Sequence, residues 1–74
     1  GGLTMTRCYA YTFDGARHTV GLVRRRVTYV CHDGVTGRLH EETFRTELEA
    51  HATFDAMAAY LAERAAPATR QLRG

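Results

Sequence analysis

The dipeptide Asp14-Gly15, which separates two alternating runs, is the feature that most restricts how this chain can fold. Aspartate followed by glycine tolerates the positive φ angles that both central residues of a two-residue β-hairpin turn require. Before it, residues 7–13 alternate between large side chains on odd positions and small ones on even positions. Because such alternation is typical of a strand, we predict a hairpin with Phe13 opposite Ala16.

The turn also predicts the register of this hairpin. Counting outward gives three further pairs: Tyr11 with His18, Tyr9 with Val20, and Arg7 with Leu22. The aromatic residues of the first strand then share a face with Val20 and Leu22, so turn chemistry and hydrophobic pattern agree.

Beyond the hairpin, the apolar positions change from even to odd numbers. Val20 and Leu22 are followed by Val27, Tyr29 and Cys31. Since two consecutive arginines make a poor tight turn, we predict one long second strand with a β-bulge at residues 24–26, which would bend the sheet and redirect the arginines. A loop over residues 33–37 then leads to a third strand, residues 38–45. Its predicted register pairs Cys31 with Leu39 and Val27 with Thr43.

The C-terminal third has the pattern of an amphipathic helix. Thr46 and Glu49 have the spacing of a capping box, in which a hydroxyl and a carboxylate satisfy free amide groups at a helix start. Apolar residues then recur at helical spacing: Ala50, Phe54, Met57, Leu61 and Ala65. We expect Phe54, Met57 and Leu61 to be buried against the sheet with Tyr9, Tyr11 or Val20. Pro67 is expected to end the helix. A helix start at Thr53 is the alternative.

These elements predict an α+β fold of order β-β-β-α: a three-stranded antiparallel meander with a long bulged central strand, followed by one C-terminal helix. We interpret residues 1–4 as a non-native leader ahead of Met5, residues 5–66 as a single domain, and residues 67–74 as a flexible tail. A chain of 74 residues is near the lower size limit for a self-sufficient core, so an elaborate active-site cavity is not expected.

The sequence points to the cytoplasm. No apolar stretch approaches the roughly 18 to 20 residues that span a bilayer, and no secretory signal pattern precedes the body. Cys8 and Cys31 are predicted to be small buried side chains, about 30 Å apart along the bulged strand and too distant for a disulfide.

Patterns of catalytic and metal-binding residues are missing from the sequence. No zinc-type spacing of cysteine and histidine occurs, and the glycines form no phosphate loop. Glu47, His51 and Asp55 fall on one helix face, which we interpret as a solvated charge ladder rather than a metal site. Glu41 and Glu42 are strand neighbours that face opposite ways. We therefore predict a non-enzymatic protein without cofactor or metal.

Charge is distributed unevenly along the chain. The net charge is +2, and all ten basic residues are arginine. Residues 1–38 hold six arginines and two aspartates, which gives +4, whereas residues 39–74 hold four arginines and six carboxylates, which gives −2. Such asymmetry is typical of a binding surface on the positive part.

The candidate binding residues are four arginines: Arg17, Arg24, Arg25 and Arg26. With Arg7, Tyr9 and Tyr11 on the same hairpin, they would form a basic sheet surface with interleaved aromatic side chains, able to hold phosphates and stack bases. In the alternative, the tyrosines lie under the helix and the arginines form a solvated edge that blocks strand association.

The C-terminal half resembles the arm-type DNA-binding domain of phage-like tyrosine integrases. The resemblance lies in Asp33-Gly34, Gly37-Arg38 and Thr43-Phe44-Arg45-Thr46, followed by an alanine-rich helix. It implies a three-stranded sheet that faces DNA with a helix behind it.

A protein partner is the interpretation we favour. Small sheet-plus-helix anti-CRISPR inhibitors of phages and mobile elements are similar in size and element order, a likeness at the level of fold alone. The sequence pI of about 8.8 is also below the value above 9 that is usual for DNA-binding domains.

Overall fold

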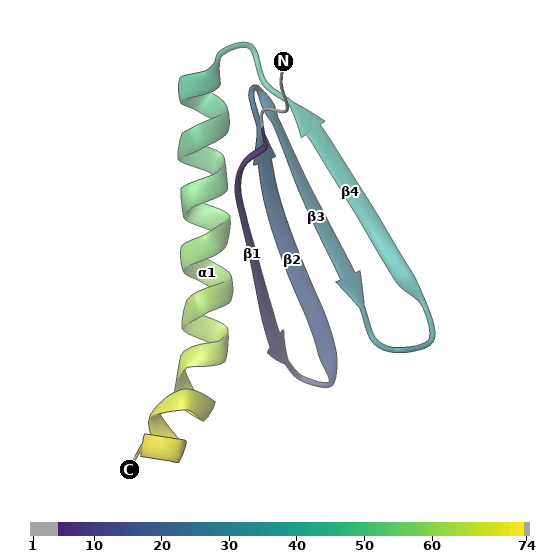
Figure 1. Cartoon of the computed structure of the whole chain (residues 1–74), viewed down its shortest axis with the longest axis vertical. Helices are drawn as coiled ribbons and strands as arrows, with labels where there is room; N and C mark the ends of the chain where they lie inside the picture. Colours follow the sequence, from purple (N-terminus) through teal and green to yellow (C-terminus); the bar gives the residue numbers. More distant parts are fainter. Residues whose placement is uncertain (1–4, 74) are drawn as a thin grey trace.

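The computed structural model describes the backbone of residues 5–73 and the side chains of residues 7–65 (Figure 1). The interpretation of residues 1–4 lies outside this range. Four strands precede one helix: β1 (Met5–Phe13), β2 (Ala16–Val23), β3 (Arg26–His32), β4 (Gly37–Thr43) and α1 (Glu47–Arg73). The strands form one antiparallel sheet in the order β1-β2-β3-β4, and α1 packs on one face of it.

The β1–β2 hairpin is confirmed in turn and register. Asp14 and Gly15 have φ angles of 53° and 74°, both positive as this turn requires. Phe13 lies opposite Ala16, and the other three predicted pairs are also present.

The prediction of three strands with a long bulged second one is wrong. Arg24 and Arg25 form a two-residue turn that separates β2 from β3, and Arg24 has a φ of 55°. The Arg25 guanidinium donates to the carbonyl oxygens of Phe44 and Arg45 at 3.3 and 3.4 Å, and the Phe44 N–H donates to the Arg25 carbonyl at 2.7 Å. Contacts with the segment after β4 therefore stabilise a turn that the local residues disfavour.

The predicted register between β3 and the last strand is wrong by one residue. Val27 lies opposite Glu42, and Cys31 lies opposite Arg38. The cause is the four-residue loop 33–36, in which Asp33 Oδ1 accepts backbone N–H groups of residues 35 and 36, each at 2.9 Å. A shift of one residue turns every side chain of the strand to the other face. Leu39 therefore faces away from α1 instead of joining the core.

The capping box at the start of α1 is confirmed, so the alternative start at Thr53 is wrong. Thr46 Oγ1 accepts the Glu49 N–H at 3.1 Å, and Glu49 Oε1 accepts the Thr46 N–H at 3.3 Å. The prediction that Pro67 ends the helix is also wrong, because α1 extends to Arg73. Its last turns bend away from the main axis (Figure 1), as expected where proline removes a hydrogen bond. Flexibility of residues 67–74 stays a prediction.

The core lies between α1 and one face of β1, β2 and β3. Its buried members are Val20, Leu22, Val27, Ala50, Phe54, Ala58 and Leu61. Burial of Phe54 and Leu61 against Val20 is therefore confirmed, whereas Met57 is only half-buried. Tyr9 is 40% exposed although its ring centroid lies 5.6 Å from that of Phe54.

Candidate binding surfaces

The four arginines predicted to bind a partner are not brought together. Arg24, Arg25 and Arg26 lie at the β2–β3 turn, near the start of α1. Arg17 lies near the opposite end of β2, seven residues or about 23 Å of strand away. A single compact site can therefore contain the turn arginines but not Arg17.

The three turn arginines differ in how much of their charge is free. They line a shallow hollow of about 270 Å³ together with Val23 and Thr43. Arg25 is occupied by the carbonyl groups described above, and Arg26 lies 3.9 Å from Glu41. Arg24 forms no hydrogen bond or ion pair with any described side chain. It is the arginine of this turn best placed to meet a partner.

The fold partly neutralises the charge asymmetry of the sequence, because α1 packs beside β1 and brings charged residues of the two halves together. Arg7 donates to Asp55 at 3.0 Å, and Arg64 donates to Asp14 at 2.6 Å. Each pair joins the positive part of the sequence to the negative part. Of these two pairs, Arg7 with Asp55 neutralises part of the excess, since Asp14 and Arg64 carry the minority charge of their parts of the sequence.

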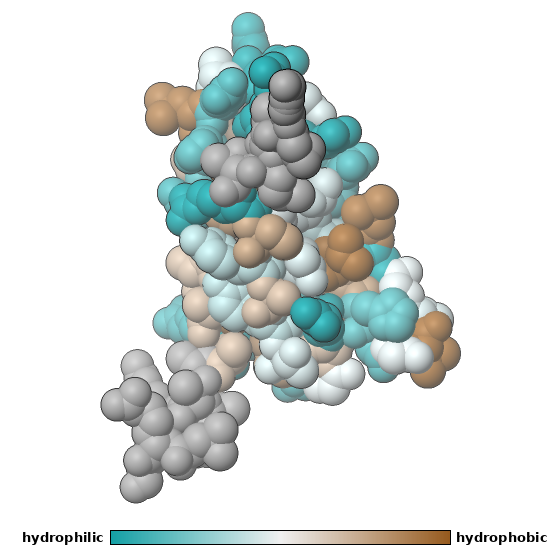
Figure 2. All heavy atoms as spheres, in the orientation of Figure 1, coloured by the Kyte–Doolittle hydropathy of each residue, from teal (hydrophilic) through white to brown (hydrophobic). Residues whose placement is uncertain are grey.

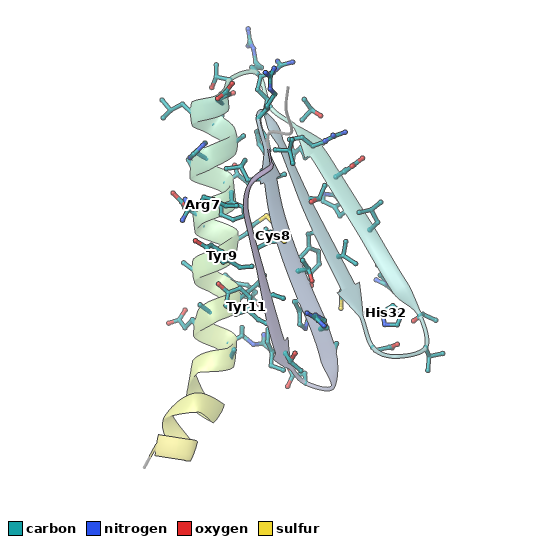
Figure 3. The ribbon with its side chains drawn as sticks, viewed as in Figure 1. Arg7, Cys8, Tyr9, Tyr11 and His32 are labelled. Carbon is teal, nitrogen blue, oxygen red and sulfur yellow. The ribbon has the colours of Figure 1, made fainter. Side chains whose placement is uncertain are left out.

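The basic, aromatic sheet surface proposed from the sequence does not form. Figure 3 shows Arg7, Tyr9 and Tyr11 pointing to the α1 side, with Cys8 on the other face. Tyr11 packs against the core, and the Arg7 guanidinium donates to the Tyr9 hydroxyl at 3.1 Å. The alternative, in which the tyrosines lie under the helix, agrees with the structure for Tyr11, whereas Tyr9 is 40% exposed.

The face of the sheet opposite α1 is open and mostly uncharged. Strand alternation places Cys8 and several threonines on it, and its middle row runs across all four strands: Ala10, Thr19, Val30 and Leu39. Val30 is 37% exposed and Leu39 66% exposed. Hydrophobic side chains are visible on the β3–β4 side in Figure 2.

A second apolar feature is a groove between α1 and β3. It has a volume of about 420 Å³ and is lined by Tyr29, Ala56, Met57, Tyr60 and Leu61. It exists because α1 packs on β1, β2 and β3, whereas all seven residues of β4 are exposed. Tyr60 is 56% exposed at the rim. We call this feature the tyrosine groove.

Beside the tyrosine groove lies a polar trio that sequence reasoning missed. His18 and Cys31 are directly opposite on β2 and β3, and His18 Nδ1 lies 2.7 Å from the Tyr29 hydroxyl. Burial raises the pKa of Tyr29, and the Cys31 thiol adds to this effect. His18 Nε2 is buried without a hydrogen-bond partner among the described residues. A hairpin at residues 24–25 would have predicted the His18–Cys31 pair.

Both cysteines are free, but the prediction that both are buried is wrong. Cys8 is exposed on the open face and Cys31 is half-buried on the other face. Because Cys8 pairs with Gly21 and Cys31 with His18, they are two strand spacings and three residues apart, about 14 Å. This separation arises across the sheet, not along one long strand.

Among the described side chains of residues 7–65, no three histidines, cysteines or acidic residues are grouped as metal ligands would be. Asp55 is one of the three helix-face residues considered from the sequence. Its carboxylate instead forms an ion pair with the Arg7 guanidinium. The described part of the chain also has no helix with the length and apolarity needed to cross a membrane.

The fold and surfaces define a small α+β domain: a four-stranded antiparallel meander with one C-terminal helix on one face. Comparison of the chain with protein family models, curated proteins and solved structures found no match.

Proposed function

We propose that this chain is a non-catalytic binding protein that covers part of the surface of a larger protein, as small inhibitors of phages and mobile elements do. The observation that carries the proposal is the tyrosine groove, with Tyr29, Met57 and Tyr60 around an apolar hollow. Tyrosine and methionine are enriched in protein interfaces, and methionine adapts its shape to a partner. The groove is of a size to accept apolar side chains from a partner.

The arginine turn, by which we mean Arg24, Arg25 and Arg26 at the β2–β3 turn, supplies the polar part of such an interface. Tyr29 is four residues from Arg25 on the same hairpin, about 13 Å of strand. A standard interface covers about 800 Å² on each partner, so one protein can contact both the groove and Arg24. An apolar centre with a charged rim is the usual arrangement.

A protein partner fits this surface better than DNA does. The integrase-like alternative needs a basic open face on the sheet. Here that face exposes Val30 and Leu39, and Arg26 on it is paired with Glu41. The cytoplasm is the compartment we propose, because two free cysteines are usual in a reducing environment.

The experiment compares two arginine substitutions on the same helix. Ala56 is exposed and lines the groove, whereas Ala59 is exposed outside its lining. We expect Ala56→Arg to lose a protein that the wild type captures from nuclease-treated cell extract, and Ala59→Arg to retain it. Circular dichroism checks that both variants are folded.

The arginine turn has its own matched pair. Arg24→Glu should weaken capture of the same protein, whereas Arg17→Glu, the same change at the far end of β2, should not. Binding to random duplex DNA is measured in parallel by fluorescence anisotropy. A DNA affinity that falls by about 10³ between low and physiological salt would reject the proposal in favour of DNA binding.

A further inference from the structure

The outer edge of β4 is the least covered part of the sheet. β4 pairs with β3 on one side only, and each of its seven residues is exposed. No described element lies beyond it (Figure 1). Such an edge offers a row of backbone donors and acceptors to another strand.

The side chains on the α1 side of β4 carry an ordered set of charges. Arg38, His40 and Glu42 alternate onto this face, where they lie opposite Cys31, Tyr29 and Val27 of β3. Neither Arg38 nor Glu42 forms a hydrogen bond or ion pair with the described residues. The strand thus has an unpaired positive charge near one end, an unpaired negative charge near the other, and histidine at its centre.

This order makes the edge complementary to a copy of itself rotated by 180°. When a two-fold axis relates two antiparallel strands, directly opposite residues lie on the same face. The register centred on His40 pairs all seven residues, from Gly37 opposite Thr43 onward. It also places Arg38 opposite Glu42 of the second copy, twice in each dimer.

The neighbouring symmetric registers lack this complementarity. Centring on Leu39 sets Arg38 against His40, and centring on Glu41 sets that carboxylate against its own copy. Opposite charges that face each other across strands stabilise pairing, and like charges destabilise it. Charges on an edge usually prevent association, but here their order favours one register.

We propose that the protein forms a homodimer by antiparallel pairing of β4 with β4 of a second copy, in the register centred on His40. The two sheets become one eight-stranded sheet, and both α1 helices lie on the same face. The two tyrosine grooves then open on the same side. This proposal is independent of the proposed function, since the groove does not include β4.

The test uses two charge reversals on exposed β4 residues, measured by sedimentation equilibrium. Wild type should show a concentration-dependent monomer–dimer equilibrium. Arg38→Glu places a carboxylate opposite Glu42 of the second copy, twice in each dimer. Glu42→Arg likewise places a guanidinium opposite Arg38 of the second copy. Each should raise the dissociation constant by about tenfold or more. Arg45→Glu, which makes the same charge change outside the strand, should dimerise like the wild type.

Mixing the two variants gives the decisive result. A chain with Arg38→Glu and a chain with Glu42→Arg restore both opposite-charge pairs when they meet. The equimolar mixture should therefore form a heterodimer at a concentration at which each variant alone is monomeric. A wild type that stays monomeric at all concentrations would refute the proposal. Variants that dimerise like the wild type, or a mixture that stays monomeric, would refute this register.

Discussion

The two edge strands of the sheet, β1 and β4, differ in how far α1 covers them. At β1, α1 lies alongside: the Tyr9 ring meets Phe54, and Arg7 and Asp14 form ion pairs with helix residues. At β4, every residue is exposed, and α1 packs on β1, β2 and β3 instead. One helix is too narrow to cover four strands, since helix packing spans about 10 Å and the sheet is about 14 Å between its outer strands. The edge left uncovered is where the polar sequence of β4 lies.

The sharpest way to test this difference is to remove apolar side chains at each edge. Phe54 is fully buried beneath β1, whereas Leu39 on β4 is 66% exposed. We expect Phe54→Ala to lower the free energy of unfolding by about 3–5 kcal/mol, enough to unfold a domain of this size. Leu39→Ala should change it by about 0.5 kcal/mol or less. Urea denaturation followed by circular dichroism measures both.

If Leu39→Ala proved as damaging as a core substitution, β4 would be covered in solution by something other than α1. A concentration-dependent loss of stability would then point to the second copy proposed above.

An intermediate effect is expected at the border between the two regions. Tyr29→Phe removes the hydroxyl that contacts His18 Nδ1, at a cost of about 1 kcal/mol. The pKa of Tyr29 is raised in the folded state, so its contribution is fully present below the unfolded value of about 10 and is lost as the pH rises through the folded value. Tyr29→Phe should therefore lose less stability than the wild type above pH 10, as measured by denaturation at several pH values. If the free energies of unfolding of the two proteins fell in parallel above pH 10, the raised pKa of Tyr29 would be contradicted.

The smallest effect should come from the exposed ion pair at the covered edge. Asp14→Asn keeps a residue that tolerates positive φ but removes the charge that meets Arg64 at 2.6 Å. We expect a slight drop in Tm at low salt that disappears near 1 M salt, because exposed pairs are screened. Glu63→Gln is the matched control, because Glu63 is exposed on α1 and forms no ion pair with the described residues. A drop that persists at high salt would mean that Asp14 acts through the turn instead.

The sequence predicted what short-range chemistry determines. Asp14-Gly15 predicted the first hairpin with its register, and Thr46 with Glu49 predicted the helix start. The failures came where distant contacts decide. Arg24 and Arg25 form a turn because Phe44 and Arg45 bind Arg25 from across the fold.

The unrecognised turn also explains why most of the candidate site was missed. With the turn at residues 24–25 unrecognised, β2 and β3 were one strand, so Tyr29 could not be placed beside His18 or against the helix. The even-to-odd change of apolar positions was the available signal, because a two-residue hairpin turn produces it: Leu22 and Val27 pair across the turn. The turn arginines were found from the sequence, but their separation from Arg17 was not.

The return of α1 to β1 also has a consequence for the order of folding. Each strand pairs only with its neighbour in the sequence, so the sheet can form through short hairpins. By contrast, Arg7 and Asp55 are 48 residues apart in the chain, and Asp14 and Arg64 are 50 apart. Closing such long loops carries the largest entropic cost, which places helix docking late on the folding pathway. Substitutions at the α1–β1 contact should then accelerate unfolding and leave the refolding rate nearly unchanged in stopped-flow experiments.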